Sequence, residues 1–459
     1  MNTSGGTSRG GAMAQAGTSS SAGTESAAGA PENEGGSAGV PSGGPLSYEV
    51  LASDNGVAFV SAPGLAHLSE AVRVSDGRGA PVRWYAHSDR DWLSVTSEGS
   101  AGEELVLTAD PGGLSADQIA YATVTLFSSP DAPAGDRIRV GLWVTSKEPP
   151  AGGNVVETAQ WLVTDPIRPY AYVDDGGADI RVYNVFTGQL EGTFPGVAAA
   201  LGSLTVSSDG SRLFAADLTR SEVVPIDLDR SKPGSPWALE STDPGDLTYA
   251  RTRGHGLVVA GTGSFYDADS GALLAPSFRG GASGIVAIDA SLDGTRLCRI
   301  DRGSAYDMEC YALDFDPDSG GLEVGAAVAG ESIGDWGVGS NGQDIALSVD
   351  GSLAFVASGS PYNFRAYDSS GAVVSILAGD AYPNNVEVTD QGVTLAGASV
   401  SYGAADVWLY APDGSLLASH KMSGSMHTLR PRQLKASGDG TRLVALTDEP
   451  TLAFVTAVP

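Results

Sequence analysis

The chain has 459 residues, of which 42% are apolar and 18% charged, with 62 glycines and a formal net charge of −29. Since a domain usually spans about 100 to 150 residues, this length predicts two or three folded units. The acidic surface argues against a nucleic acid partner, and no apolar run reaches the ~18 residues of a membrane span. Abundant glycine with few charges favours an all-β, turn-rich fold over helical bundles.

Residues 1–45 are mostly Gly, Ser, Ala and Thr, with hardly any large apolar side chain. Because such a segment buries too little surface to offset its ordering entropy, we expect a disordered tether. No signal peptide pattern is visible in it. It resembles the stalks that follow the lipid-modified cysteine of bacterial surface lipoproteins, although it holds no such cysteine. The resemblance implies a lipid anchor upstream; a plain disordered tail is the alternative.

Residues 46–148 contain short alternating runs such as "VAFV", "WLSV", "ATVTLF" and "IRVGLWV". Turn formers separate them, among them Asp76-Gly77 and the "DPGG" of residues 110–113. About seven strands in about 100 residues predict a small Ig-like β-sandwich. We expect Trp84 and Trp92 to anchor its core or one of its faces.

Three stretches of this unit resemble the BACON and related Ig-like bacterial domains. They are "VRWYAHSDRDWLSV" (82–95), "LVLTADPGGLSADQIAYATVTL" (105–126) and "IRVGLWV" (138–144). The resemblance implies either carbohydrate or mucin binding or a spacer role, and it transfers no site residue. The Pro- and Gly-rich "TSKEPPAGGN" (145–154) marks the expected domain boundary, so that the next unit spans residues 149–459.

One phrase recurs in the second unit. It appears as "SSDGSRLFAAD" (207–217), "ASLDGTRLCRID" (290–301), "LSVDGSLAFVAS" (347–358) and "ASGDGTRLVALTD" (436–448). With a turn-like "RGHG" near Arg253 and a degenerate "DQG" at Asp390 included, the steps between neighbouring turns are roughly 40 to 57 residues, which matches a four-stranded propeller blade. We expect each Asp-Gly pair to form a two-residue hairpin with positive torsions, followed by a strand covered on both faces. The prediction is a β-propeller of seven blades, with six or eight as alternatives.

We place the blades at residues 161–194, 204–239, 246–278, 285–329, 344–378, 385–421 and 433–458. The last has three obvious strands, and "NVVET" (154–158) is expected to supply the missing outer strand and so remove an exposed edge. "SSDGSRLFAAD" with the following "VVPIDLD", and "YVDDGGADIRVYNVFTGQL" (172–190), resemble YVTN-type β-propeller repeats. Here Ser, Leu, Val or Gly replaces the proline before Asp-Gly. The resemblance implies a propeller fold and an extracellular, periplasmic or cell-surface protein.

The two cysteines, Cys298 and Cys310, flank Ser304 symmetrically. A hairpin turning there places them opposite each other on paired strands, which permits a disulfide. Two free buried thiols are the alternative.

No catalytic motif stands out. The five histidines form no HxxxH or HExxH pattern, and the chain has no GxxxxGK[ST] phosphate loop. We therefore expect no cofactor, no metal site built from histidines and no nucleophilic catalysis.

If the Asp-Gly turns mark one rim of the propeller, ligand-binding loops converge at the opposite rim. The candidates there are Asp174, Asp217, Asp301, Trp336, Tyr362, Asn363, Tyr382, Asn384, Tyr402, His427 and Arg430, with Asp175 beside the first. The aspartates suit either Ca²⁺ or turn capping. The aromatic rings suit either sugar stacking or packing between blades.

The resulting hypothesis is a non-catalytic exported or cell-surface scaffold whose propeller binds protein or carbohydrate. One alternative is a propeller enzyme of the lactonase or lactone-forming isomerase type, which rests on fold analogy. The other is a structural surface-layer component.

Overall fold

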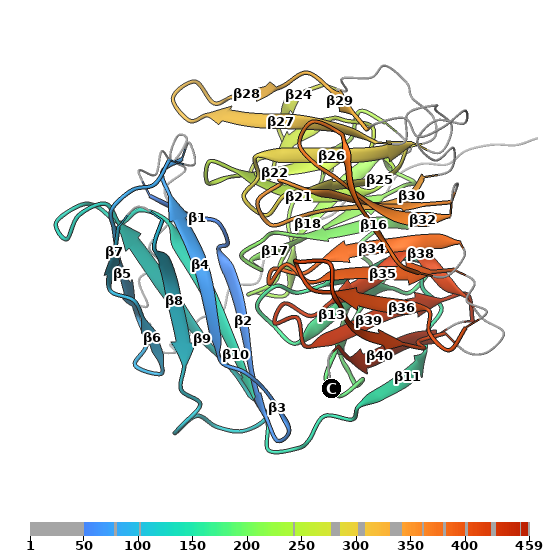
Figure 1. Cartoon of the computed structure of the whole chain (residues 1–459), viewed down its shortest axis with the longest axis horizontal. Helices are drawn as coiled ribbons and strands as arrows, with labels where there is room; N and C mark the ends of the chain where they lie inside the picture. The colour runs from blue at the N-terminus through green and yellow to red at the C-terminus, as the bar shows by residue number, and fades with distance from the viewer. Residues whose placement is uncertain are drawn as a thin grey trace, which may run out of the picture. The chain divides into compact units, whose positions relative to one another are not determined.

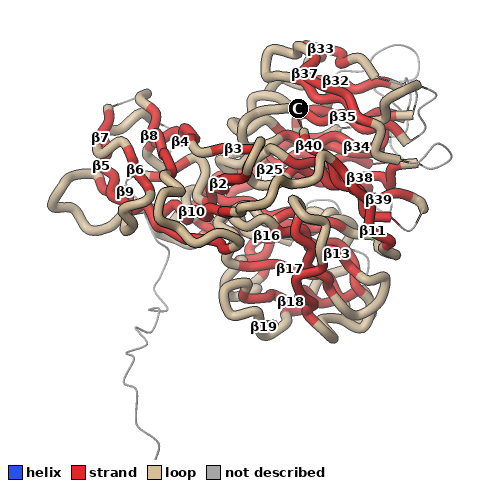
Figure 2. Tube along the Cα trace, turned by 90° about the horizontal axis from the view of Figure 1, so that it is seen from below, coloured by secondary structure: helices blue, strands red, loops and turns tan. Residues whose placement is uncertain are grey.

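The computed structural model describes residues 50–77, 80–100, 102–241, 244–276, 285–301, 308–330, 342–359, 362–379, 382–399, 403–423, 428–449 and 451–457. These residues form strands and loops and no helix (Figure 2), which confirms the all-β prediction. In this part of the chain nothing forms a helix long and apolar enough to cross a membrane. The expected tether, residues 1–45, lies outside the described residues. The described residues of Gly44–Pro459 belong to one compact unit.

The first ten strands form two sheets, which we call the N-terminal module (residues 50–144). The strands are β1 (Leu51–Ala52), β2 (Gly56–Ala62), β3 (Leu65–His67), β4 (Ser69–Ser75), β5 (Trp84–Ser88), β6 (Leu93–Val95), β7 (Glu98–Gly99), β8 (Glu104–Ala109), β9 (Gln118–Phe127) and β10 (Arg137–Val144). One sheet has the order β1-β4-β8-β6 and the other β3-β2-β10-β9-β5-β7. One apolar core takes side chains from both sheets. Trp84 is fully buried in it, and Trp92 packs against it half-buried.

The remaining strands form seven sheets, the seven-sheet module (residues 152–456), which runs from green to red in Figure 1. The first sheet contains β12 (Leu162–Thr164), β13 (Tyr170–Asp174), β14 (Ile180–Asn184) and β15 (Leu190–Phe194). The second contains β16 (Leu201–Val206), β17 (Arg212–Asp217), β18 (Glu222–Asp227), β19 (Lys232–Pro233) and β20 (Trp237–Ala238). The third contains β21 (Leu247–Thr252), β22 (His255–Ala260), β23 (Phe265–Asp267) and β24 (Leu273–Ala275).

The fourth sheet contains β25 (Ile285–Ala290), β26 (Arg296–Asp301), β27 (Glu309–Asp316), β28 (Gly321–Val324) and β29 (Val328–Ala329). The fifth contains β30 (Gly342–Leu347), β31 (Ala354–Ser358), β32 (Asn363–Tyr367) and β33 (Val373–Leu377). The sixth contains β34 (Pro383–Val388), β35 (Thr394–Ala398), β36 (Val407–Tyr410) and β37 (Leu416–His420). The seventh contains β38 (Leu429–Ala436), β39 (Arg442–Thr447) and β40 (Thr451–Thr456), with β11 (Gly152–Val156) at its edge.

The first strands of neighbouring sheets contact one another around a closed circuit. Contacts run from β12 through β16, β21, β25, β30 and β34 to β38, and β38 contacts β12 again. The pairing of β11 with β40 adds a strand from the start of the module to its last sheet, as we expected for residues 154–158, although the strand begins two residues earlier. The first strand of the last sheet, β38, begins at Leu429, earlier than the predicted start of this blade at residue 433. A register shift lies between Leu429 and Leu434 of this strand.

The repeated Asp-Gly phrase forms a five-residue turn, so the prediction of a two-residue hairpin was wrong. In the turn of residues 207–211, Gly210 N–H donates to the carbonyl of Ser207 at 2.8 Å. Gly210 takes a φ of +64°, whereas Asp209 does not enter the positive-φ region. The Asp209 carboxylate instead accepts bonds from the Ser207 hydroxyl and the Ser211 N–H. This is the pattern of a hairpin loop built around a type I turn.

The same bonds recur in the other three copies of the phrase. The hydroxyls of Ser291, Ser348 and Ser437 donate to the aspartate two residues later. The residue after each glycine is Ser or Thr, and its N–H and hydroxyl both donate to that aspartate. The repeat therefore encodes a locally saturated turn of the form Ser-x-Asp-Gly-Ser/Thr. We call the end of the module that carries these turns the turn face, and the opposite end the loop face.

Candidate functional site

The turn face of the seven-sheet module is covered by the N-terminal module. Ser208, in the first repeated turn, donates to the Asn55 side chain at 2.6 Å. Gly56 lies so close to this turn that an added Cβ would sit 2.0 Å from the Ser208 carbonyl oxygen. Arg73 lies 3.7 Å from Asp350, in another copy of the turn. The N-terminal module therefore contacts more than one of the repeated turns.

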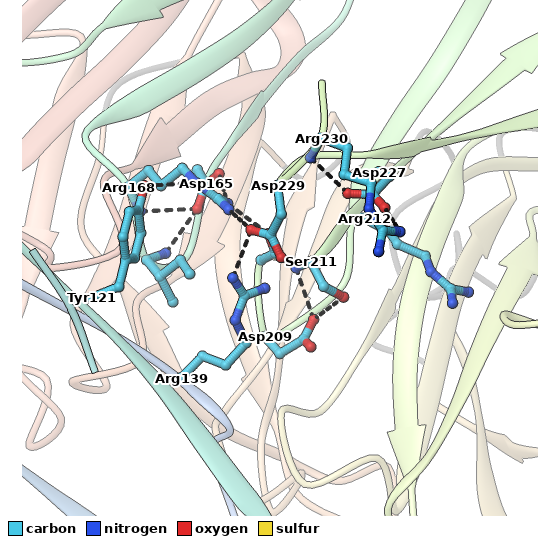
Figure 3. Close-up of polar contacts among 12 residues, drawn as sticks. Tyr121, Arg139, Asp165, Arg168, Asp209, Ser211, Arg212, Asp227, Asp229 and Arg230 are labelled. Carbon is cyan, nitrogen blue, oxygen red and sulfur yellow. Dashed lines mark hydrogen bonds and ion pairs between the residues drawn. The ribbon is translucent and has the colours of Figure 1, made fainter. Parts of the chain in front are cut away.

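Arg168 is the centre of one polar cluster at this interface, shown in Figure 3. Its guanidinium donates to the carboxylates of Asp165 at 3.0 Å and Asp229 at 2.5 Å, and to the Tyr121 hydroxyl of β9 at 3.2 Å. Arg139 of β10 reaches the same Asp229 at 2.7 Å. Two arginines, one from each module, therefore share one carboxylate.

A second cluster is more deeply buried. Arg251 of β21 pairs with Asp136 at 2.5 Å, and both side chains are less than 10% exposed. Arg251 also donates to the Ala52 carbonyl of β1 at 3.2 Å. A further contact between the two modules is made by Trp143 of β10, whose ring stacks on that of Phe186 with centroids 4.6 Å apart. These contacts bury part of the turn face under the N-terminal module.

The predicted aspartates of the loop face act in turns. Asp174, at the end of β13, accepts the N–H groups of Gln160 and Trp161, and burial raises its pKa. Asp217, at the end of β17, accepts N–H groups from Ala199 and Thr219. Burial alone would raise the pKa of Asp217, but backbone hydrogen bonds lower it overall. The oxygens of both carboxylates accept backbone N–H groups, and Asp217 also pairs with Arg220 at 2.9 Å.

Tyr362 and Tyr382 come together at the loop face. Their rings meet edge to face with centroids 5.2 Å apart, and they are 53% and 43% exposed. Tyr362 precedes β32 and Tyr382 precedes β34, so neighbouring sheets supply them. Both take positive φ values, 64° and 65°, which are rare for bulky residues. The Ser399 N–H and hydroxyl both donate to the Tyr382 carbonyl and hold it in place.

The other described candidates are less available. Asn384 is buried and donates to the Leu429 carbonyl at 2.7 Å. Arg430 donates to the Thr447 carbonyl at 2.9 Å. Asn363 adjoins Tyr362, and within the described residues its buried Oδ1 has no hydrogen-bond partner. Of this group, only Asn363 has unused hydrogen-bonding capacity next to the tyrosine pair.

The side chains of four predicted site residues lie outside the described part of the chain. Trp336, Tyr402 and His427 lie outside the described residues. The backbone of Asp301 ends β26, opposite Ile285, while its side chain lies outside the described part.

A cavity of about 250 Å³ lies among the first strands of the seven sheets, and the sequence analysis missed its charged lining. Five carboxyl groups and two cations line it, namely Asp246, Asp289, Asp344, Glu387 and Asp390 with Arg432 and Lys435. The sequence does contain a signal for this lining, namely an acidic residue within or directly before the apolar first strand of a sheet. Examples are "AIDAS", "QDIALS" and "NNVEVT".

Cys298 and Cys310 sit opposite each other on β26 and β27 and form a disulfide. Both are buried, at 0% and 1% exposed.

Within the described residues, no three His, Cys, Asp or Glu side chains are grouped so that they could hold a metal ion. No protein-family model and no curated protein sequence matches the chain.

Proposed function

We propose that the seven sheets are the blades of a YVTN-like β-propeller and that the N-terminal module is a BACON-like, Ig-like sandwich. Three observations support the ring. Each sheet is an antiparallel meander, the first strands contact one another in a closed circuit, and β11 joins the last sheet. A strand that joins the two ends of the module removes an exposed edge and holds a ring closed.

The proposed role is that of a non-catalytic exported or cell-surface binding protein. The disulfide Cys298–Cys310 supports an oxidising compartment, because such bonds persist mainly outside the cytosol. The capped aspartates and the covered turn face leave the loop face as the surface for a protein or carbohydrate ligand.

The tyrosine pair is the single observation that carries this role and favours carbohydrate. Two exposed rings held in strained backbone conformations require support from the surrounding structure, and such strain collects at ligand-binding sites. An aromatic ring with a hydroxyl at its edge offers a sugar both an apolar face and a hydrogen bond.

A glycan array with the full chain tests the proposal. We expect a set of related glycans to bind, and the double variant Tyr362→Ala, Tyr382→Ala to lose at least about tenfold in affinity, or ~1.4 kcal/mol. Leu416→Ala is the matched control, because Leu416 is also exposed but lies on β37. It should bind as the unaltered protein does.

Three outcomes would contradict the proposal. A blank array across broad panels contradicts carbohydrate binding, and equal binding by the double variant contradicts the site. Hydrolysis of lactones together with a bound divalent metal would replace the binding role by catalysis.

A further inference from the structure

The cavity inside the seven-sheet module is lined by more acidic than basic side chains. Asp246 pairs with Arg432 at 2.5 Å, and Glu387 pairs with Lys435 at 2.5 Å. Asp289, Asp344 and Asp390 also line the cavity, and no ion pair with a cation at salt-bridge distance holds them among the described residues. Charge in an enclosed space is costly unless protons or counter-charges neutralise it.

The three carboxyls accept few hydrogen bonds from the protein. Asp289 accepts the Leu347 N–H at 2.8 Å. Asp344 accepts the N–H groups of Val386 and Ile345. Because of burial above all, the pKa of Asp289 rises to about 7 and that of Asp344 to about 8. Near neutral pH a proton therefore occupies each of these carboxyl groups for much of the time, unless a bound cation takes its place.

Asp390 lacks the role that its counterparts have in the repeated turns. In the turn Thr389-Asp390-Gln391-Gly392, Gly392 N–H donates to the Thr389 carbonyl as in the other copies. The carboxylate, however, stands one position earlier than in Ser-x-Asp-Gly, and it lines the cavity instead of capping the turn. Burial, then Glu70 and Glu387, raise its pKa to about 7.

Gln433 provides an independent sign of a missing ligand. It lines the same cavity, and its side chain is only 3% exposed. Among the described residues its Oε1 has no hydrogen-bond partner. A buried carbonyl oxygen without a donor costs about 1–3 kcal/mol, so a ligand that donates a hydrogen bond there recovers this loss.

The acceptors are too dispersed for a single metal ion, since no described group of three could hold one. A molecule that carries positive charge at more than one point fits such an arrangement better. We propose that the cavity binds a small organic diamine, whose ammonium groups are held by Asp289, Asp344 and Asp390 and donate a hydrogen bond to Gln433. This site is separate from the tyrosine pair and does not depend on the function proposed for it.

Binding of such a cation is linked to pH, because the ammonium groups replace protons on the carboxyls. The charged groups that act on Asp344 are Lys435, Glu387 and Arg432, and those that act on Asp289 are Glu387 and Lys435. Asp390 faces Glu387 and, from the N-terminal module, Glu70 and Asp54. Affinity should rise as pH increases from about 6 to about 8.5, where the carboxyls are ionised.

Calorimetric titration of the full chain with 1,4-diaminobutane tests the site, with 1,4-butanediol as the uncharged probe. We expect saturable binding near pH 8.5, proton release seen as a dependence on buffer, and affinity at least about tenfold weaker near pH 6. The diol should give no binding. Absence of diamine binding near pH 8.5, or equal binding of the diol, would overturn the proposal.

Two variants connect the binding to the cavity. Asp344→Asn and Asp390→Asn resemble the protonated acids, so they should fold, and each should weaken diamine binding at least about tenfold. Asp413→Asn, an exposed carboxylate outside the cavity, should leave binding unchanged. Unchanged affinity in both cavity variants contradicts the assignment. Calcium chloride that binds in place of the diamine, with the same dependence on Asp344, would show an inorganic cation site and also overturn it.

Discussion

The turn face and the loop face of the seven-sheet module differ in how far their polar and aromatic side chains are occupied by contacts within the protein. On the turn face, the aspartates of the repeated phrase are occupied by hydroxyl and N–H donors within two residues of them. On the loop face, Tyr362 and Tyr382 lie outside the repeated phrase and remain exposed in strained backbone conformations. Repetition in this sequence therefore marks the scaffold, and departures from the repeat mark candidate sites.

Removing the buried ion pair under the N-terminal module should give the largest effect. Arg251→Ala leaves Asp136 buried without its partner, so we expect the free energy of unfolding to fall by about 3–5 kcal/mol in urea titrations. Arg83→Ala, which breaks the exposed pair with Glu98, should lower the free energy of unfolding far less, because solvent screens exposed ion pairs. Equal losses in the two variants would mean that the turn face is not covered as described.

Stability should also depend on pH through the cavity acids. The folded-state pKa values of Asp289, Asp344 and Asp390, about 7, 8 and 7, lie above an unfolded value of ~3.9. Their contribution to stability is therefore complete below about pH 4 and is lost as pH rises to about 8.

Urea midpoints measured at successive pH values between 4 and 9 check this direction. His67, whose pKa is also raised, changes stability in the same direction. Asp344→Asn should flatten the fall, because its side chain cannot ionise. A midpoint that rises over this range would contradict the charge balance assigned to the cavity.

The smallest effect is expected within a single repeated turn. In Asp350→Ala the hydroxyls of Ser348 and Ser352 lose their acceptor, which should cost about 1 kcal/mol. Asp350→Asn keeps one acceptor oxygen and should recover most of this loss. If both variants were as stable as the unaltered protein, the aspartate of the repeat would not stabilise its turn.

Part of this architecture was predictable because it depends on short-range patterns. The alternation of apolar residues indicated strands, and the spacing of the Asp-Gly phrase separated the sheets to within a few residues. The symmetric placement of Cys298 and Cys310 indicated their cross-strand pairing. The exact turn was missed because Asp-Gly suits both a two-residue hairpin and a type I turn, and the flanking serines decide between them.

The sequence by itself determined the all-β class, through its alternation of apolar residues, and the repeated turns, whose hydrogen bonds join residues fewer than six positions apart. Only the tertiary structure decided that Asp390 lines a cavity while Asp209 caps a turn, and that Arg251 meets Asp136 across the two modules. The physical reason is that burial and charge at a residue are set by segments far away in the chain, and no local pattern encodes them.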